Sequence, residues 1–404
     1  MRDAVHRPRR VFFIANGLFG TSIAGGDIHF LHLARGARDA GHEVVFVGPA
    51  VTEHVLRREG LDFPVLLTDR HPAGEFRCSG LRAQLTVFGR FLARLVRSRR
   101  IVRAIQEHDI AYAVSDYWVD TLPVVWSGAG LKMMILHMRA PSAKDALFSD
   151  RPDIAGSRLG SLHYALSQRS SLRRFRVLPA KRILHVHPSS VPYLEDAGFS
   201  PSEIVFVPVG LDVAAADRVP DQPKLYDSIW IGRIHRQKGL DDLIEVLRAL
   251  AHAVPGFRAV LVGDVEDHLR PRIEAAGIGD AVRFAGVVMG EEKFRLIKSS
   301  RMMLIPSHYE GWPAVIGEAL ICGVPVLGYD LPGYRPVTGD LMSYVPPFDL
   351  AMLCHKAKEM VVATRGQAIV LAPDGLARFR ARMSVAAMRR SFNELLAAHT
   401  GAAR

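Results

Sequence analysis

The sequence predicts an α/β protein with two doubly wound parallel sheets in tandem. Three observations lead to this prediction. Short apolar, β-branched runs alternate with amphipathic runs of helical spacing, as in successive βαβ units. The alternation restarts after a polar, proline-containing segment, residues 214–224. The chain of 404 residues is also too long for one hydrophobic core, so we place a domain boundary near residue 210.

The first series begins with a strand at Val11–Ala15 and a helix at Ile28–Ala40. Gly41 and His42 then stop the helix, and a second strand follows at Glu43–Val47. Further short β-branched runs predict strands at 111–115, 132–137, 182–187 and 204–208.

The second series predicts a helix at Leu240–His252 and a closing helix at Arg378–His399. Its predicted strands are 228–232, 258–263, 282–285, 302–305 and 324–327.

The composition is that of an ordered globular protein: 49% of residues are hydrophobic, 23% are charged, and the mean hydropathy is +0.11. No uncharged apolar run is long enough to cross a bilayer. The formal charge of +11 favours an anionic partner. Three widely spaced cysteines without metal-ligand spacing favour a reducing cytosol, so we expect a cytoplasmic protein.

The segment Arg82–Arg103 is rich in arginine, contains no acidic residue, and carries apolar residues at helical spacing. Two interpretations stay open. The segment is either a helix that covers the core with its arginines outside, or a basic helix that lies peripherally on an anionic membrane at its inner face.

The run from His308 to Val326 carries two glutamates, Glu310 and Glu318, in the order strand end, turn, helix, glycine stop, strand. We expect Pro313 at the first helical position and Gly323 just after the helix. Glu310 then lies at the carboxyl end of a strand, where doubly wound sheets bind ligands, and the helix N-terminus beside it suits a phosphate.

Two cations, Arg233 and Lys238, follow the first strand of the second series and are expected at the same sheet edge. Arginine offers a planar fork and lysine a point charge, so together they suit a diphosphate.

The first domain has a glycine-rich loop after its first strand, with Asp27 as a helix cap, but the loop lacks the dinucleotide-binding GxGxxG pattern. A glycine pair before a helix can present N–H groups to an anion. His137 closes a strand and is a candidate for the site, and Asp116 is a weaker one. His185 and His187 alternate on one strand without a third ligand, so we expect a structural role. The loop glycines are Gly17, Gly20, Gly25 and Gly26.

The ordered motifs resemble those of the retaining nucleotide-sugar glycosyltransferases of family 4, which have the GT-B fold. They are GGD and GHEV, the strand ending in His137, VPVGLD, GRIHRQKG, LVGD, VRFAGVV and EGWPAVIGEALICGVPV. The resemblance implies two Rossmann-like domains facing an interdomain cleft, 1–209 for the acceptor and 210–384 for the nucleotide sugar. It also implies a terminal helix, 385–404, that crosses back to the first domain.

By the same resemblance, a hexose-type sugar would pass from a nucleotide-diphosphate sugar to a hydroxyl acceptor, without metal or cofactor, by front-face attack. Glu310 would hold sugar hydroxyls and Glu318 the ribose. Arg233 and Lys238 would neutralise the diphosphate, and His137 would contact the donor sugar. The other donor-binding positions implied are Gly25, Gly26, Gly263, Gly286, Val287, Gly311, Trp312, Ala314 and Val315.

Other functions of the same fold are a sugar phosphorylase and a nucleotide-sugar epimerase, and a non-catalytic nucleotide-sugar-binding protein is a further alternative. Nucleic-acid binding is disfavoured because basic and aromatic residues do not interleave.

Overall fold

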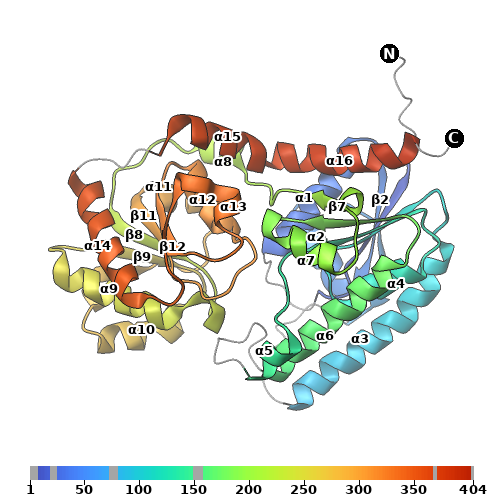
Figure 1. The fold of residues 1–404 in the computed structure, drawn as a ribbon, viewed down its shortest axis with the longest axis horizontal. Coiled ribbons are helices and arrows are strands. Elements are labelled where there is room, and N and C mark those ends of the chain that lie inside the picture. The colour runs from blue at the N-terminus through green and yellow to red at the C-terminus, as the bar shows by residue number, and fades with distance from the viewer. Residues whose placement is uncertain (1–7, 19–24, 72–80, 149–157, 367–370, 402–404) are drawn as a thin grey trace. The chain divides into compact units, whose positions relative to one another are not determined.

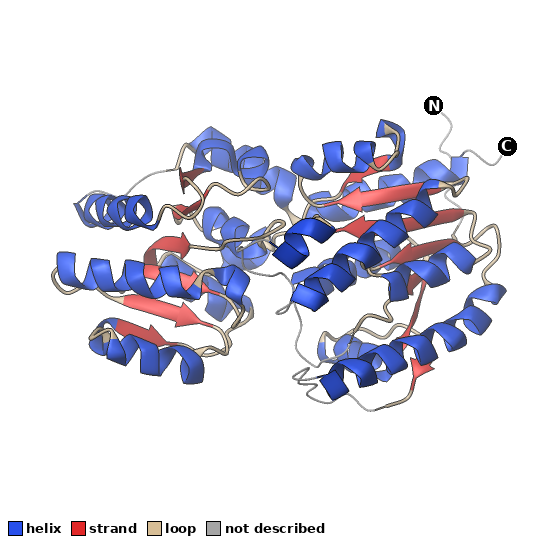
Figure 2. Cartoon of the chain, turned by 60° about the horizontal axis from the view of Figure 1, so that its bottom comes forward, coloured by secondary structure: helices blue, strands red, loops and turns tan. Residues whose placement is uncertain are grey.

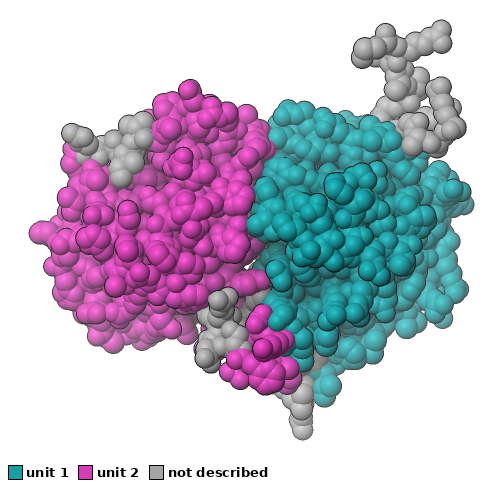
Figure 3. All heavy atoms as spheres, in the orientation of Figure 1, with its two compact units in different colours: residues 1–143, 162–210, 386–404 teal, residues 144–161, 211–385 magenta. Residues whose placement is uncertain are grey.

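A computed structural model describes residues 8–18, 25–71, 81–148, 158–366 and 371–401. The chain divides into two compact units (Figure 3). Unit 1 comprises residues 1–143, 162–210 and 386–404, and unit 2 comprises residues 144–161 and 211–385. Gly20 and Cys78 lie outside the described residues.

Unit 1 contains a seven-stranded parallel sheet in the order β3-β2-β1-β4-β5-β6-β7 (Figure 1). The order reverses between β1 and β4, which makes this the topological switch point of a doubly wound sheet. The strands are β1 (Arg10–Ile14), β2 (Glu43–Pro49), β3 (Val65–Asp69), β4 (Ile110–Ala113), β5 (Leu131–Leu136), β6 (Lys181–His185) and β7 (Ile204–Phe206).

Helices cover both faces of this sheet (Figure 2). The central strands are buried on both faces, so they read as continuous apolar runs. The helices of unit 1 are α1 (Gly25–Asp39), α2 (Ala50–Arg58), α3 (Leu81–Ile101), α4 (Trp118–Trp126), α6 (Arg158–Arg176, which begins within unit 2), α7 (Val191–Asp196) and α16 (Val385–Gly401).

Unit 2 contains a six-stranded parallel sheet in the order β10-β9-β8-β11-β12-β13, with its switch point between β8 and β11. The strands are β8 (Tyr226–Ile231), β9 (Ala259–Val262), β10 (Val282–Phe284), β11 (Ser300–Ile305), β12 (Val326–Tyr329) and β13 (Met342–Val345).

The helices of unit 2 connect these strands and cover the sheet. Apart from its first residue, α5 (Ala143–Phe148) also groups with this unit. The others are α8 (Val213–Arg218), α9 (Leu240–Ala253), α10 (Glu266–Ala275), α11 (Gly290–Lys298), α12 (Ala314–Ile321), α13 (Arg335–Thr338), α14 (Leu350–Gly366) and α15 (Pro373–Met383).

The predicted α/β class with two doubly wound sheets is confirmed. The individual elements differ from the prediction in three respects. β3 and β13 are outer strands that the sequence analysis did not identify. Pro313 is the N-cap of α12 with extended backbone, so its expected place at the first helical position was wrong by one residue. Gly323 does follow the helix in the left-handed conformation, and the Val324 amide donates to the Ala319 carbonyl.

The closing helix predicted at Arg378–His399 is two helices, because the chain is extended at Ser384. Ser384 pairs with Leu211 as an isolated β-bridge, so the two segments that lead out of unit 2 lie next to each other. Within unit 1, Phe392 of α16 packs against the rings of Phe13 and Tyr112.

Of the helices described, none is both long and apolar enough to cross a membrane.

Candidate functional site

The loops that follow β8 and β11 meet at the switch point of unit 2. The Lys238 Nζ atom donates to Glu310 Oε1 at 2.6 Å, and both side chains are largely buried. Because a charged group loses hydration when it is buried, the close opposite charge offsets part of the cost of burying each side chain.

Backbone contacts fix these two loops against each other. The His308 amide donates to the Gln237 carbonyl at 2.7 Å. Gly239 has a φ of +62°, and a Cβ added there would overlap the Pro306 carbonyl oxygen. Only glycine therefore allows the loop after β8 to approach the end of β11 this closely.

Asp242 on α9 supports the loop after β11. Its Oδ2 atom accepts from His308 Nε2 at 2.8 Å and from the Tyr329 hydroxyl at 2.6 Å. Burial acts to raise the pKa of Asp242, but these two hydrogen bonds outweigh it and leave the pKa below its usual value. His308 is thus held two residues before Glu310 by an ionised carboxylate.

Glu318 lies on the second turn of α12. Its Oε1 atom accepts from Lys293 Nζ of α11 at 2.6 Å. Its Oε2 atom is buried and finds no donor among the described residues. A buried carboxylate oxygen without a donor is costly in the unliganded protein and is available to a hydroxyl group.

Three glycines bring the loops after β8, β9 and β10 together. Gly263 has a φ of +136°, and a Cβ there would overlap the Gly232 carbonyl oxygen. The Gly263 amide donates to the carbonyl of Gly286, which also has positive φ. Val287 follows with an exposed side chain, so this loop edge is accessible.

The turn between Glu310 and α12 is well packed. Gly311 and Trp312 are buried, and the Trp312 ring meets Tyr334 edge-on with ring centroids 6.2 Å apart. The Trp312 Nε1 atom is buried with no acceptor among the described residues. Ala314 and Val315 open α12 and are half-buried.

The candidate residues of unit 1 meet at the ends of β5 and the glycine loop. Gly25 and Gly26 form the first turn of α1, and a Cβ on Gly26 would lie 3.5 Å from His137 Nε2. His137 follows β5, and its ring lies edge-on to that of His29, with centroids 5.6 Å apart.

Burial keeps these histidines neutral near pH 7. It lowers the pKa of His137 to about 4 and, together with the neighbouring His137, lowers that of His29 to about 3. Burial and His185 also lower the pKa of His187 to about 4. His137 is therefore a hydrogen-bonding imidazole and not a cation.

The two other candidate histidines, His185 and His187, contact a backbone carbonyl and a serine hydroxyl. His185 Nδ1 lies 2.8 Å from the His187 carbonyl oxygen, and His187 Nδ1 lies 2.7 Å from Ser189 Oγ. No group of three or more potential metal ligands occurs within the described part of the chain.

Asp116 is buried beside α6. Gln168 Nε2 and the Tyr164 hydroxyl both donate to Asp116 Oδ2, and Gln168 Nε2 also donates to the Met138 carbonyl. Burial raises the pKa of Asp116 to about 6. The network links Asp116 to the residue that follows His137.

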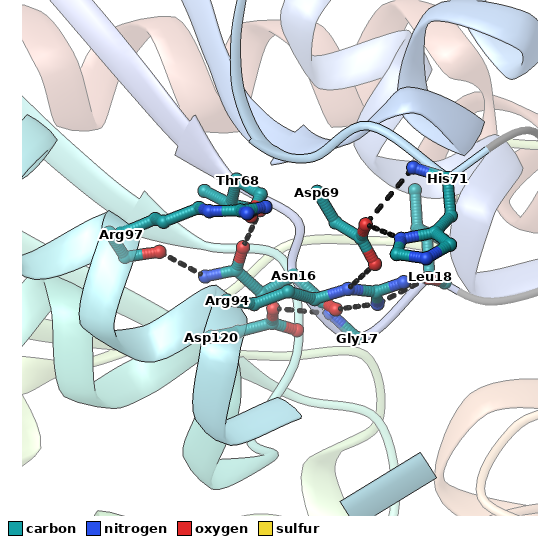
Figure 4. A network of polar contacts seen from close by, with 10 residues as sticks. Asn16, Gly17, Leu18, Thr68, Asp69, His71, Arg94, Arg97 and Asp120 are labelled. Carbon is teal, nitrogen blue, oxygen red and sulfur yellow. Dashed lines mark hydrogen bonds and ion pairs between the residues drawn. The ribbon is translucent and has the colours of Figure 1, made fainter. Parts of the chain in front are cut away.

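A second polar network fixes the start of the glycine loop (Figure 4). Arg94 of α3 donates from Nε to Asp69 Oδ2 at 3.2 Å and from Nη1 to the carbonyls of Asn16 and Leu18. Asp120 Oδ1 accepts from the Gly17 amide at 2.9 Å, and burial raises the pKa of Asp120 to about 7. The side chains of Arg94 and Asp120 thus hold the backbone just after β1.

The structure brings together Lys238 with Glu310, and Gly26 with His137. Arg233 is exposed, whereas Lys238 is largely buried. Lys293 could not be predicted, because nothing in the spacing of α11 indicates a contact with Glu318. The Arg94–Asp69–Asp120 network could not be predicted either, because its members are far apart along the chain.

Residues 217–350 match the family model described as "Glycosyl transferases group 1". The matched segment contains Lys238, Glu310 and Glu318 and is similar to the domain that this model describes.

Curated relatives match over part of their length. The chain is 30% identical over 161 residues to the 2-deoxystreptamine N-acetyl-D-glucosaminyltransferase of Streptomyces fradiae, covering 38% of each chain. It is 26% identical over 160 residues to the D-inositol 3-phosphate glycosyltransferase of Segniliparus rotundus, covering 36% of each. The matched stretch thus spans less than half the length of these relatives.

Solved structures match nearly the whole chain. Anabaena HepE in complex with UDP and glucose matches with a TM-score of 0.70 and 18% identity, over 96% of this chain and 100% of that one. Sucrose-phosphate synthase from Thermosynechococcus elongatus matches with a TM-score of 0.72 and 16% identity, over 98% and 100%. The fold is GT-B.

Proposed function

We propose that this GT-B protein is a retaining glycosyltransferase of family 4, which moves a hexose-type sugar from a nucleotide-diphosphate sugar to a hydroxyl acceptor. The observation that carries the proposal is the Lys238–Glu310 pair. It lies at the switch point of the sheet, where a doubly wound sheet binds its ligand, and within the segment that matches the group 1 glycosyl transferase model.

In this proposal Lys238 and Glu310 contact two different parts of the nucleotide sugar. The ammonium of Lys238 has three N–H groups and donates one of them to Glu310, so the other two can donate to diphosphate oxygens. Glu310 accepts from sugar hydroxyls, and the exposed Arg233 adds a second cation for the diphosphate.

Glu318 is suited to the ribose because one of its oxygens is already occupied. Lys293 holds Oε1 and fixes the side chain, while Oε2 lacks a donor among the described residues. A ribose hydroxyl would supply that missing hydrogen bond. Gly263, Gly286 and Val287 are assigned to the base, and Gly25, Gly26, Gly311, Trp312, Ala314 and Val315 to the phosphates and the sugar.

The reaction we propose is a front-face displacement. The bond from the anomeric carbon to the phosphate oxygen breaks while the acceptor oxygen bonds to that carbon on the same face, and the leaving phosphate oxygen takes the acceptor proton. Lys238 and Arg233 stabilise the developing phosphate charge, and neutral His137 hydrogen-bonds the sugar. Configuration at the anomeric carbon is retained, and the scheme uses no metal.

The first test is donor binding, measured as thermal stabilisation by UDP-, GDP-, ADP- and TDP-sugars. Because HepE was captured with UDP and glucose, UDP-glucose is the first donor to try. A donor at about 100 times its Kd stabilises the protein by about 2.7 kcal/mol. We expect Glu318→Gln to lose most of that shift and Glu292→Gln, an exposed glutamate on α11, to keep it. No shift with any donor would refute the proposal.

The second test separates this activity from the alternatives of the same fold. Transfer to a hydroxyl acceptor, with the anomeric configuration of the product read by NMR, identifies a retaining transferase. Phosphate-dependent release of sugar 1-phosphate would identify a phosphorylase, and donor interconversion without acceptor an epimerase. Donor binding without turnover on a broad acceptor panel would identify a binding protein.

A further inference from the structure

Helix α3 exposes a stripe of large apolar side chains. Leu85 is 61% exposed, Phe88 45%, Leu92 45% and Val96 63%. Their spacing of three, four and four residues places all of them along one face of the helix. Single exposed apolar residues are common on protein surfaces, but a continuous stripe of four on one helix indicates an interaction surface.

The same helix is basic throughout. Leu81–Ile101 contains six arginines and no acidic residue. Arg94 lies opposite the stripe, is buried, and pairs with Asp69. Arg99 and Arg100 are exposed in the last turn, near the end of the stripe, whereas Arg97 lies on another face and donates from Nη1 to the Thr68 carbonyl.

This arrangement revises both interpretations of the sequence. The helix does cover the core, but it does so with Phe91, Arg94, Leu95 and Ser98, and not with a purely apolar face. The interpretation that puts its arginines outside is wrong for Arg94. Leu85, Phe88, Leu92 and Val96, which that interpretation places toward the core, are exposed instead.

A second basic helix is connected to the first. α6 has five arginines and no acidic residue, and it exposes Leu159 and Leu166. The Trp118 ring contacts Phe88 and Phe91 of α3 as well as His163 of α6. Figure 1 shows α3 at the edge of unit 1, and the exposure of Leu85, Phe88, Leu92 and Val96 shows which of its faces meets solvent.

We propose that α3 binds the surface of an anionic lipid bilayer. Leu85, Phe88, Leu92 and Val96 would enter the boundary between headgroups and acyl chains, and the arginines would contact headgroup phosphates. The proposal concerns unit 1 alone and does not depend on the glycosyl transfer proposed above.

The charge pattern favours a bilayer over other partners. In a symmetric dimer the same face meets itself, so two acid-free arginine helices would repel each other. A nucleic acid would neutralise the arginines, but its phosphates offer nothing to four exposed aliphatic and aromatic side chains along the helix. An anionic bilayer offers both phosphates and an apolar interior.

The experiment is co-sedimentation of the full-length protein with vesicles. We expect binding to mixed phosphatidylcholine and phosphatidylglycerol vesicles, little binding to phosphatidylcholine alone, and weakening at high salt. Leu85→Ser/Val96→Ser should weaken binding about tenfold or more, because each lost aliphatic side chain removes apolar area from the lipid boundary. Adding Arg100→Glu to this double variant should weaken vesicle binding further.

The matched control is Val362→Ser. Val362 is 56% exposed on α14 of unit 2, close to the exposure of Val96. It should bind vesicles like the wild type, and unchanged melting temperatures should show that all variants fold. The proposal is overturned if the wild type does not bind, if Val362→Ser weakens binding equally, or if Leu85→Ser/Val96→Ser binds normally. A wild-type dimer in gel filtration that Leu85→Ser/Val96→Ser converts to a monomer would overturn it in favour of a second copy.

Discussion

Two lysine–glutamate pairs determine the charge balance of the candidate site in the unliganded protein. Lys238 neutralises Glu310, and Lys293 neutralises Glu318. In the proposed donor complex, Lys238 would keep one N–H on Glu310 and offer the other two to the diphosphate, while Glu310 would accept from sugar hydroxyls. Donor binding would thus add charge-assisted hydrogen bonds to a pair that is already formed.

The first prediction concerns Glu310→Gln. It keeps the shape of the side chain but removes the charge that partners Lys238 and the strong acceptor for sugar hydroxyls. We expect kcat/KM for sugar transfer to fall about 100-fold or more, comparable with the loss of one transition-state contact. The control is Glu266→Gln, which removes an exposed glutamate paired with Arg270 in the same unit. Equal losses in both variants would contradict a specific role for Glu310.

The second prediction concerns Gly263→Ala. The positive φ and the overlap of the new Cβ with the Gly232 carbonyl both oppose the substitution. We expect it to lower the free energy of unfolding by about 3 kcal/mol or more, measured by urea denaturation. Gly279→Ala is the matched control, since a Cβ there has ordinary contact with Glu274 Cγ and should change stability by less than about 1 kcal/mol. Comparable losses would argue against backbone strain at Gly263.

At the scale of elements, the central strands of both sheets could be predicted from the sequence because they are buried on both faces. Their β-branched runs are continuous and end in glycine, proline or polar residues. The outer strands β3 and β13 are short and partly exposed, so their sequences VLLTD and MSYV carry weak signals. The sequence left two interpretations of α3 open, because hydrophobic spacing cannot reveal a buried ion pair such as Arg94–Asp69.

The candidate site was predictable where it follows strand ends. Lys238 and Glu310 both follow strands of the second series, and strands next to a switch point bring their loops together. Partners supplied by helix surfaces, such as Lys293 for Glu318, depend on how helices pack. No periodicity in a single sequence encodes that packing.

The third prediction concerns the polar network at the start of α4 and tests the pKa of Asp120. Its folded pKa, about 7, is raised above the usual 3.8, so the folded protein binds the proton more tightly than the unfolded chain. The stability that this proton contributes is present at low pH and is lost as pH rises through about 7. Asp120→Asn can still accept from the Gly17 amide but does not ionise. We therefore expect the melting temperature of Asp120→Asn, relative to wild type, to rise from pH 5 to pH 7 and then level off.

Two comparisons check that interpretation. Asp374→Asn, at the exposed first turn of α15, should show no such trend with pH. The buried histidines act in the opposite direction, since their lowered pKa values cost stability as pH falls below about 6.5. They are present in wild type and variant alike, so they cancel in the difference. A flat difference between Asp120→Asn and wild type would show that Asp120 is ionised throughout.

At the scale of the whole molecule, unit 1 is built from three separate stretches of chain. Its last stretch, α16, buries Met388, Phe392 and Leu396 completely. Arg389 pairs with Asp39, and Asn393 donates to the Gly36 carbonyl. The core of the first unit therefore includes side chains from the end of the sequence.

The fourth prediction concerns Phe392→Ala. Removing this ring leaves a cavity beside Phe13 and Tyr112, so we expect unit 1 to lose about 3–5 kcal/mol of stability. Hydrogen exchange should show faster exchange for β1 and β4, with the strands of unit 2 unaffected. Glu394→Ala, an exposed residue of the same helix, should leave both units unchanged. Equal destabilisation of the two units would mean that they unfold as one.

The place of α16 in unit 1 has a consequence for synthesis on the ribosome. Residues 10–206, which supply every strand of the first sheet, emerge before any residue of α16. All six strands of the second sheet emerge before α16 as well. The second unit can therefore complete its fold before α16 is available to pack against Phe13 and Tyr112 in the first unit. During translation, the part of the protein that is made first is the last to be finished.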